Sequence, residues 1–398
     1  CAGHRRDSRT SGGVSRSSSG HGRLALEHDV PIRIHGAAGV AFRHEPLEDG
    51  TEVEVGAVVL RTIHTPGHRP EHCCFAVIDH SRSDEPWLVL TGDSLFVGDA
   101  GRPDLAVEAR EGAEGLFHSL RRLVELGDGV EVFPGHVAGS LCGAAMSSKA
   151  STTIGFERRF NPALCSELAD FVAGALGPQP PRPPNMEQIV DLNRGELLGA
   201  QPRLERIESV ADEAIVLDVR PTGAFAAGHH PGAVGIPVEG SSFATKAAFV
   251  LPERPVVLHA TDAEEAAQAA RALHAVALFG IAGWQEGGGA ERLEPVSLDE
   301  LERMLADDSV ELLDVREADE RDGGYIPGSK NLPYRTVRAA AENGLLDGRP
   351  VVTICESGPR AAVAASVLRA AGIDARPVLD GGVSAWNGET TSFRRCGS

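Results

Sequence analysis

The feature that most constrains the fold is an internal repeat in the second half of the sequence. Ile215-Val-Leu-Asp-Val-Arg220 is followed by Gly228-His-His-Pro-Gly-Ala233, whereas Glu311-Leu-Leu-Asp-Val-Arg316 is followed by Gly324-Tyr-Ile-Pro-Gly-Ser329. Matched segments in the same order, about 100 residues apart, predict two tandem copies of one domain.

A second pair of segments extends the repeat toward the C-terminus. Gly280-Ile-Ala-Gly-Trp284 is echoed by Gly381-Gly-Val-Ser-Ala-Trp386, which makes the two segments expected counterparts. Within each copy, apolar runs alternate with Ala-rich stretches, a pattern typical of buried parallel strands joined by helices. The expected strands are residues 215–219, 256–259, 312–315 and 351–354.

The first half of the chain shows short apolar segments separated by turns. Such segments are typical of strands in a sandwich-like sheet. A helix is expected where Leu116, Leu120 and Leu123 recur at helical spacing. The expected elements are strands 30–34, 52–63, 73–78, 87–91 and 130–133, and helices 112–126 and 162–176.

These patterns divide the 398 residues into four regions. Residues 1–22 are rich in Ser, Arg and Gly and are interpreted as a disordered or damaged start. Residues 23–200 form the first domain and include a stiff connector with five prolines at 178–184. The two copies of the repeat occupy residues 201–292 and 293–398.

Composition limits the partners that this chain can bind. A formal net charge of -19 repels a polyanion, which argues against nucleic acid, and no apolar run is long enough to cross a membrane. The seven cysteines are an odd number and widely scattered, so reduced thiols and a cytoplasmic location are expected. Homo-oligomer formation is left open.

The strongest chemical signal is the loop Cys355-Glu-Ser-Gly-Pro-Arg360, between an expected strand and an expected helix. A cysteine at this position faces the positive end of the helix dipole, which favours the nucleophilic thiolate. The first copy has Ala260-Thr-Asp-Ala-Glu-Glu265 at the same place and therefore no nucleophile. Asp218 with Arg220, and Asp314 with Arg316, are expected to form scaffold ion pairs.

A second constellation consists of turns that each follow a strand in the first domain. These turns are His64-Thr-Pro-Gly-His68, Thr91-Gly-Asp93 and Phe133-Pro-Gly-His136. Imidazole and carboxylate groups suit zinc or iron, so the order His, Asp, His predicts a metal site. His64, His72, Cys73 and Cys74 are interpreted as core or supporting residues.

The Cys355 loop, the Asp-Val-Arg segments and the closing Gly-Gly-x-x-x-Trp together resemble the rhodanese family of sulfurtransferases. The resemblance implies that Cys355 carries a sulfane sulfur as a persulfide, that Arg360 stabilises anionic sulfur, and that Glu356, Ser357 and Gly358 bind substrate. Its implied partners are a low-molecular-weight thiol persulfide or another sulfane-sulfur donor, and a thiol acceptor.

The turns at His68, Asp93 and His136 resemble the metallo-β-lactamase fold, in the branch that contains glyoxalase II and the persulfide dioxygenases. The resemblance implies that these three residues are metal ligands and that the cofactor is one iron, or alternatively one or two zinc ions. The implied fold is an α/β multidomain chain: an αββα sandwich, N-terminally incomplete, followed by two rhodanese-like parallel-sheet domains.

One departure from the family pattern bears on function. The His-x-His-x-Asp-His motif that the resemblance places upstream of Arg23 is absent, because residues 13–19 read Gly-Val-Ser-Arg-Ser-Ser-Ser. We therefore expect weak metal binding. The sequence favours a persulfide dioxygenase and sulfurtransferase of sulfide metabolism, and leaves open a glyoxalase II-like zinc thioester hydrolase and a metal-free sulfur-relay module.

Overall fold

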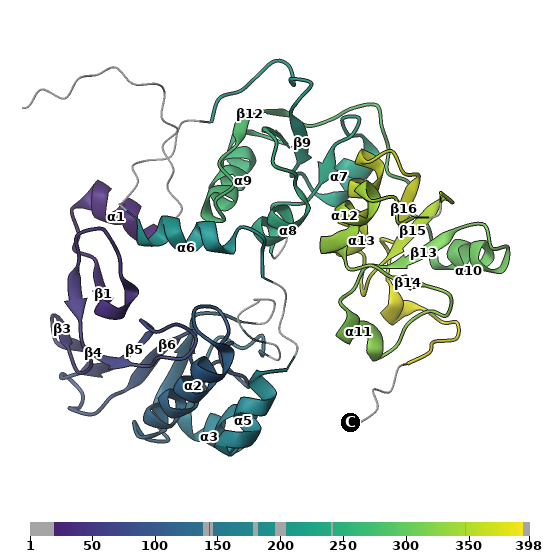
Figure 1. Ribbon diagram of the computed structural model, residues 1–398. Helices are drawn as coiled ribbons and strands as arrows, with labels where there is room; N and C mark the ends of the chain where they lie inside the picture. The colour runs from purple at the N-terminus through teal and green to yellow at the C-terminus, as the bar shows by residue number, and fades with distance from the viewer. Residues whose placement is uncertain are drawn as a thin grey trace, which may run out of the picture. The chain divides into compact units, whose positions relative to one another are not determined.

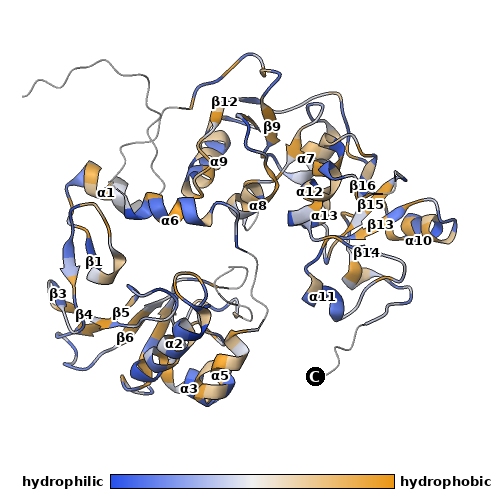
Figure 2. Cartoon of the chain, viewed as in Figure 1, coloured by the Kyte–Doolittle hydropathy of each residue, from blue (hydrophilic) through white to orange (hydrophobic). Residues whose placement is uncertain are grey.

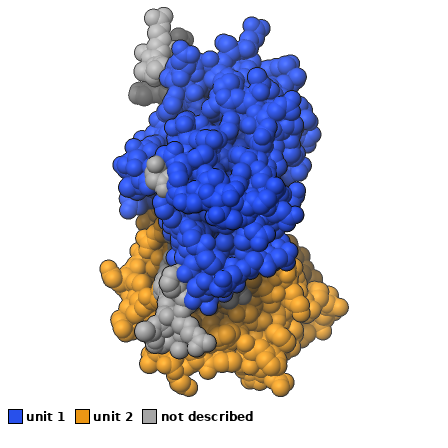
Figure 3. Space-filling view, turned by 90° about the vertical axis from the view of Figure 1, so that its right-hand side faces the viewer, with its two compact units in different colours: residues 1–18, 183–189, 198–398 blue, residues 19–182, 190–197 orange. Residues whose placement is uncertain are grey.

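The computed structural model describes residues 20–137, 143, 146–177, 182–195, 204–239, 242–346 and 348–392. The chain divides into two compact units (Figure 3): of the described residues, unit 1 holds those within 183–189 and 204–392, and unit 2 holds those within 20–182 and 190–195. In the described ranges, no helix has both the length and the apolar character that a bilayer crossing requires.

Unit 2 is built on a six-stranded mixed sheet in the order β3-β4-β5-β6-β7-β8, beside a two-stranded sheet of β1 and β2 (Figure 1). Its strands are β1 Arg33–His35, β2 Glu45–Leu47, β3 Glu52–Val55, β4 Val58–His64, β5 Cys73–Asp79, β6 Leu88–Gly92, β7 Glu131–Pro134 and β8 Thr152–Thr153. Its helices are α1 Gly20–His28, α2 Ala109–Val124, α3 Ile154–Phe160, α4 Pro162–Cys165 and α5 Leu168–Ala175.

Amphipathic helix α2 covers one face of this sheet. Leu116, Leu120 and Leu123 are fully buried in one cluster with Val89 and Val132. Figure 2 shows that the same helix also carries hydrophilic residues. Because strand side chains alternate in direction, the neighbours Leu90 and Phe133 point to the opposite face. They are 41% and 36% exposed, so the described part of unit 2 buries this region of the sheet mainly on one face.

The expected elements of unit 2 are confirmed with small shifts, except that two expected elements are each divided. The helix expected at 162–176 is two helices, α4 and α5, because the backbone is extended at Ser166 and Glu167. The single strand expected at 52–63 is two strands, because a turn at Gly56 with a φ of 64° separates β3 from β4. Helix α1 begins at Gly20, so the predicted start of the domain at residue 23 falls inside a helix. Helix α6 (Met186–Arg194) follows the expected connector, of which residues 178–181 lie outside the described ranges.

Unit 1 contains the two predicted copies, and their sheets have the same parallel topology. The strand orders are β10-β9-β11-β12 and β14-β13-β15-β16. The first copy comprises β9 Ile215–Asp218, α7 Thr222–Ala227, β10 Val234–Gly235, α8 Phe243–Val250, β11 Val256–Ala260, α9 Ala263–Ala275 and β12 Ile281–Glu286. The second comprises α10 Leu298–Ala306, β13 Glu311–Asp314, α11 Ala318–Asp322, β14 Lys330–Asn331, the 3-10 turn η2 Tyr334–Thr336, α12 Val337–Glu342, β15 Val351–Ile354, α13 Pro359–Ala370, β16 Ala375–Pro377 and the 3-10 turn η3 Val383–Ala385.

The strand register shows which residues of the two copies are equivalent. Asp218 pairs with His259 and Asp314 pairs with Ile354, so the next residues, Ala260 and Cys355, are equivalent. The Ala260 carbonyl accepts a hydrogen bond from Gly287, and the Cys355 carbonyl accepts one from Val383.

The counterpart of the segment after Gly381 is therefore the glycine run at 287–289. The expected pairing with Gly280-Ile-Ala-Gly-Trp284 is wrong, because that segment lies mostly inside strand β12. A shared Gly and Trp spacing indicated similarity of sequence but not of position in the sheet.

The two copies share one hydrophobic core, which explains why they form one compact unit. Leu217 and Leu258 of the first copy lie in the same buried cluster as Val363 and Leu368 of α13. At the seam, the Gly235 N–H donates a hydrogen bond to Ser366 Oγ at 3.1 Å.

We expect Leu120→Ala to destabilise unit 2 by about 2–5 kcal/mol, because it leaves a cavity under α2. Leu26→Ala is the matched control, since Leu26 is 53% exposed and its truncation creates no cavity. Urea unfolding followed by circular dichroism measures both variants. Equal stability of the two variants would contradict the packing described for α2.

Candidate functional site

The thiol of Cys355 lies in a short loop between β15 and α13. Cys355 is 1% exposed, and the Gly358 N–H donates a hydrogen bond to its Sγ at 3.1 Å. Gly358 has a φ of 104°, and a Cβ there would lie 2.3 Å from the Leu379 carbonyl oxygen. Glycine is therefore required for the backbone to present this N–H to the sulfur. We name residues 355–360 the cradle.

The segment after β16 closes the cradle from the other side. Val383 donates a backbone hydrogen bond to the Cys355 carbonyl, and the Ser384 hydroxyl donates to the Glu356 carbonyl. A Cβ on Gly382 would lie 2.3 Å from both of these carbonyl oxygens. Gly382 is thus needed because backbone packs directly on backbone at this position.

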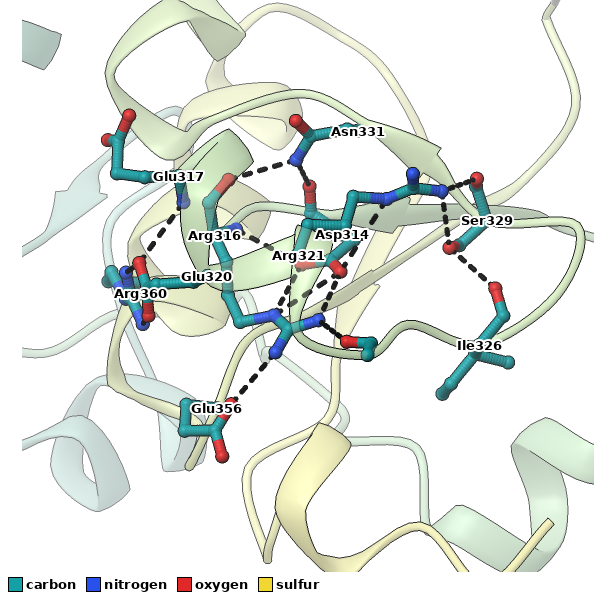
Figure 4. Close-up of polar contacts among 11 residues, drawn as sticks. Asp314, Arg316, Glu317, Glu320, Arg321, Ile326, Ser329, Asn331, Glu356 and Arg360 are labelled. Atoms are coloured by element: carbon teal, nitrogen blue, oxygen red, sulfur yellow. Dashed lines mark hydrogen bonds and ion pairs between the residues drawn. The ribbon is translucent and has the colours of Figure 1, made fainter. Parts of the chain in front are cut away.

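Arg316 joins the cradle to the strand scaffold (Figure 4). Its guanidinium binds the carboxylate of Asp314 at 2.7 Å, the carbonyl of Gly324 at 2.7 Å and Glu356 at 3.0 Å. Arg316 and Asp314 are both almost fully buried. The expected scaffold ion pair is confirmed here, and the pair of Arg220 and Asp218 in the first copy is confirmed at 2.6 Å. The negative charge of Glu356 is therefore paired with Arg316.

Arg360 makes a bidentate ion pair with Glu320 of α11, at 2.5 and 2.7 Å (Figure 4). These hydrogen bonds raise the pKa of Arg360 above its usual value, and the Cys355 thiolate contributes in the same direction. Sequence reasoning missed Glu320, since no local pattern links residues 40 positions apart. Of the three residues predicted to bind substrate, Glu356 is half-buried, Ser357 is exposed and Gly358 is buried.

In the first copy, a carboxylate occupies the helix terminus that corresponds to the cradle. Asp262 accepts hydrogen bonds from the Glu264 and Glu265 N–H groups, both at 2.9 Å, and so caps α9. Glu265 in turn accepts from the Thr261 N–H at 2.5 Å. The backbone donors that would hold an anion are engaged by the copy's own side chains, which agrees with its lack of a thiol.

In unit 2, two of the three predicted metal ligands, His68 and His136, lie close to the third, Asp93. Its two carboxylate oxygens lie 3.6 Å from His68 Nε2 and 3.0 Å from His136 Nε2. The Nδ1 of buried His68 is 2.9 Å from the Arg102 carbonyl. When Nδ1 donates there, Nε2 carries the lone pair and faces Asp93.

The neighbouring polar residues have supporting contacts. His72 Nε2 accepts from the Asp93 N–H at 3.0 Å, and Nδ1 lies 2.9 Å from Thr65 Oγ1. Burial lowers the pKa of His72 to about 4, which keeps the ring neutral. Burial also raises the pKa of Cys73 to about 11 and of Cys74 to about 12, so neither thiol ionises readily. His64 Nε2 lies 2.8 Å from the Pro70 carbonyl.

The donor set does not amount to a complete metal site. Over the described ranges, no group of three or more His, Cys, Asp and Glu side chains is placed to hold a metal ion. His4 lies outside these ranges. We therefore derive no chemical step through a metal from the residues around Asp93.

Comparison with known proteins identifies the classes to which the parts of this chain are similar. The rhodanese-like domain family matches residues 297–389. A metallo-beta-lactamase of Staphylococcus aureus matches in structure with a TM-score of 0.59 and 26% identity, over 66% of this chain and 79% of that protein.

Curated relatives match parts of the chain. An uncharacterized protein of Mycobacterium bovis is 36% identical over 33% of this chain and 55% of its own length. A probable polyketide biosynthesis zinc-dependent hydrolase of Bacillus velezensis is 32% identical over 28% and 45%, and a persulfide dioxygenase of Bos taurus is 29% identical over 37% and 52%. The chain thus spans about half the length of these relatives.

The class is that of a metallo-β-lactamase fold joined to rhodanese-like α/β domains. More specifically, residues 297–389 match the rhodanese-like domain family, and the chain has homologues among the persulfide dioxygenases. The resemblance and the fold class expected from the sequence are confirmed.

We expect Asp314→Ala to cost about 3–5 kcal/mol of unfolding free energy, because it leaves the buried Arg316 cation without its closest partner. Glu342→Ala is the control: Glu342 pairs with Arg338 but its side chain is 59% exposed, so we expect less than about 1 kcal/mol. Chemical denaturation compares the two. A cost below that of the control would contradict the scaffold role of Arg316.

Proposed function

We propose that this chain transfers sulfane sulfur through Cys355 in sulfide and persulfide metabolism. The observation that carries the proposal is the hydrogen bond from the Gly358 N–H to Cys355 Sγ, within the segment that matches the rhodanese-like family. A sulfur anion at this position is stabilised by that N–H and by the positive end of α13.

The proposed reaction is redox-neutral. The Cys355 thiolate attacks the terminal sulfane sulfur of a donor, the donor's S–S bond breaks, and the leaving group departs with the electron pair. An acceptor thiolate then takes the outer sulfur of the persulfide and regenerates the Cys355 thiolate. Because Cys355 is almost fully buried, the donor must present a narrow, terminal sulfur atom.

The reaction requires a reduced cysteine. Cys73, Cys74, Cys165 and Cys355 are free thiols. A reducing compartment such as the cytoplasm therefore suits the proposed activity.

For unit 2, we infer descent from a persulfide-oxidising domain whose metal site is incomplete in the described residues. The similarity to a persulfide dioxygenase and the convergence of His68 and His136 on Asp93 support this inference. The similarity to a zinc-dependent hydrolase favours a second candidate, a zinc thioester hydrolase. Metal analysis distinguishes the two, since one iron marks the oxidising domain and one or two zinc ions mark the hydrolase.

We expect a sulfane donor to add one sulfur atom to Cys355 and to no other cysteine, because Cys355 is the one cysteine in the described ranges that lies in a cradle. Mass spectrometry of peptides after treatment with thiosulfate measures the adduct. Cys355→Ser should abolish transfer to cyanide, whereas Cys165→Ser, which alters an exposed thiol, should leave it unchanged. An adduct on another cysteine that persists in Cys355→Ser would contradict the proposal.

We expect far less than one iron per chain after anaerobic incubation with Fe(II) and desalting, because the described donors do not complete a site. Plasma mass spectrometry measures the metal, with zinc tested in parallel. Tightly held, stoichiometric metal that is lost in His68→Ala would contradict the incomplete site and indicate a ligand outside the described ranges.

A further inference from the structure

The thiol-less copy packs against the second copy next to the cradle. Helix α8 of the first copy contacts the turn η2 of the second, and the rings of Phe249 and Tyr334 meet edge to face with centroids 6.4 Å apart. Turn η2 also contacts α13, the helix that begins within the cradle. This seam therefore extends from α8 to the end of the cradle.

Lys246 lies on the face of α8 that forms this seam. It is three positions from both Phe243 and Phe249 and four from Val250, and residues at these spacings share one face of a helix. Phe243 and Val250 are buried in the cluster that also contains Cys355, and Phe249 packs against that cluster. Helical geometry thus directs Lys246 from the first copy toward the second.

The electrostatics agree with this placement. Burial lowers the pKa of Lys246, the Arg360 cation acts in the same direction, and the Cys355 thiolate opposes both. The two groups at the ends of the cradle, Cys355 and Arg360, therefore both affect the ionisation of Lys246. Each charged side chain of the cradle is paired with a residue outside it, since Arg360 binds Glu320 and Arg316 binds Glu356.

We propose that both copies contribute to the active site. Lys246 of the first copy binds the anionic end of the sulfane-sulfur donor, beside Cys355 of the second copy. This inference rests on the sulfur transfer proposed above and adds to it a donor-binding residue that the first copy contributes. With thiosulfate, the thiolate takes the outer sulfur, the S–S bond breaks and sulfite leaves with the electron pair.

Two alkylating reagents of nearly equal size test the charge at this site without requiring sulfur transfer. Iodoacetate is an anion and iodoacetamide is neutral; with either, the thiolate forms an S–C bond and iodide leaves. The ratio of their rates at Cys355, measured by peptide mass spectrometry at one pH, cancels effects on thiol ionisation and access that act equally on both reagents.

In Lys246→Met we expect the iodoacetate to iodoacetamide ratio to fall about tenfold, the loss expected for one charge-assisted contact. Lys246→Arg should restore most of the ratio, because it keeps the charge. Lys149→Met is the matched control: it removes the same charge from an exposed position in unit 2 and should change nothing. The KM for thiosulfate in thiocyanate formation should rise in Lys246→Met with little change in kcat.

An unchanged ratio in Lys246→Met, or an equal fall in Lys149→Met, overturns the inference. Circular dichroism checks folding, and Lys246→Gln replaces Lys246→Met if the latter does not fold. If Lys246 controls the alkylation ratio but wild-type protein forms no thiocyanate, the proposed sulfur transfer fails while the anion site stands. The two failures are thus distinguishable.

Discussion

The buried guanidinium of Arg316 is the constraint on which the arrangement of the second copy depends. A buried cation costs several kcal/mol unless its hydrogen bonds are satisfied. Arg316 satisfies them with three segments that are separate in sequence: the end of β13, the loop at Gly324 and the cradle at Glu356. The first two contacts hold the end of β13 to the loop at Gly324, and the third ties the cradle to both, which fixes Cys355 at the carboxyl end of β15.

The first copy shows that this framework and the chemistry are separable. Arg220 binds Asp218 and the Gly228 carbonyl just as Arg316 binds Asp314 and the Gly324 carbonyl. The loop after β11 nevertheless has no thiol, and Asp262 caps the following helix. The ion pair therefore determines the fold of both copies, whereas a few loop residues determine whether a copy can hold a sulfur anion.

Local patterns allowed the parallel strands of both copies and the position of Cys355 to be predicted from the sequence. A buried strand and the loop after it are defined by consecutive residues, so their signal is local. The echo between Trp284 and Trp386 was misleading because it ignored strand register, which places the first inside β12 and the second after β16. The ion pair of Glu320 with Arg360, and the approach of α8 to the cradle, depend on strand order and on packing between copies, which residue spacing does not reveal.

In unit 2, the polar network around Asp93 likewise shows that the fold and the chemistry of a site are separable. His68 is oriented by the Arg102 carbonyl, and His72 is held between Thr65 and the Asp93 N–H, so hydrogen bonds alone account for both rings. Because β6 and β7 are adjacent and parallel, the turns that follow them bring Asp93 and His136 together whether or not a metal is bound. Convergence of these residues thus follows from the sheet, whereas metal affinity requires further donors. In both units, sheet topology positions the candidate groups and the loop residues decide which chemistry remains.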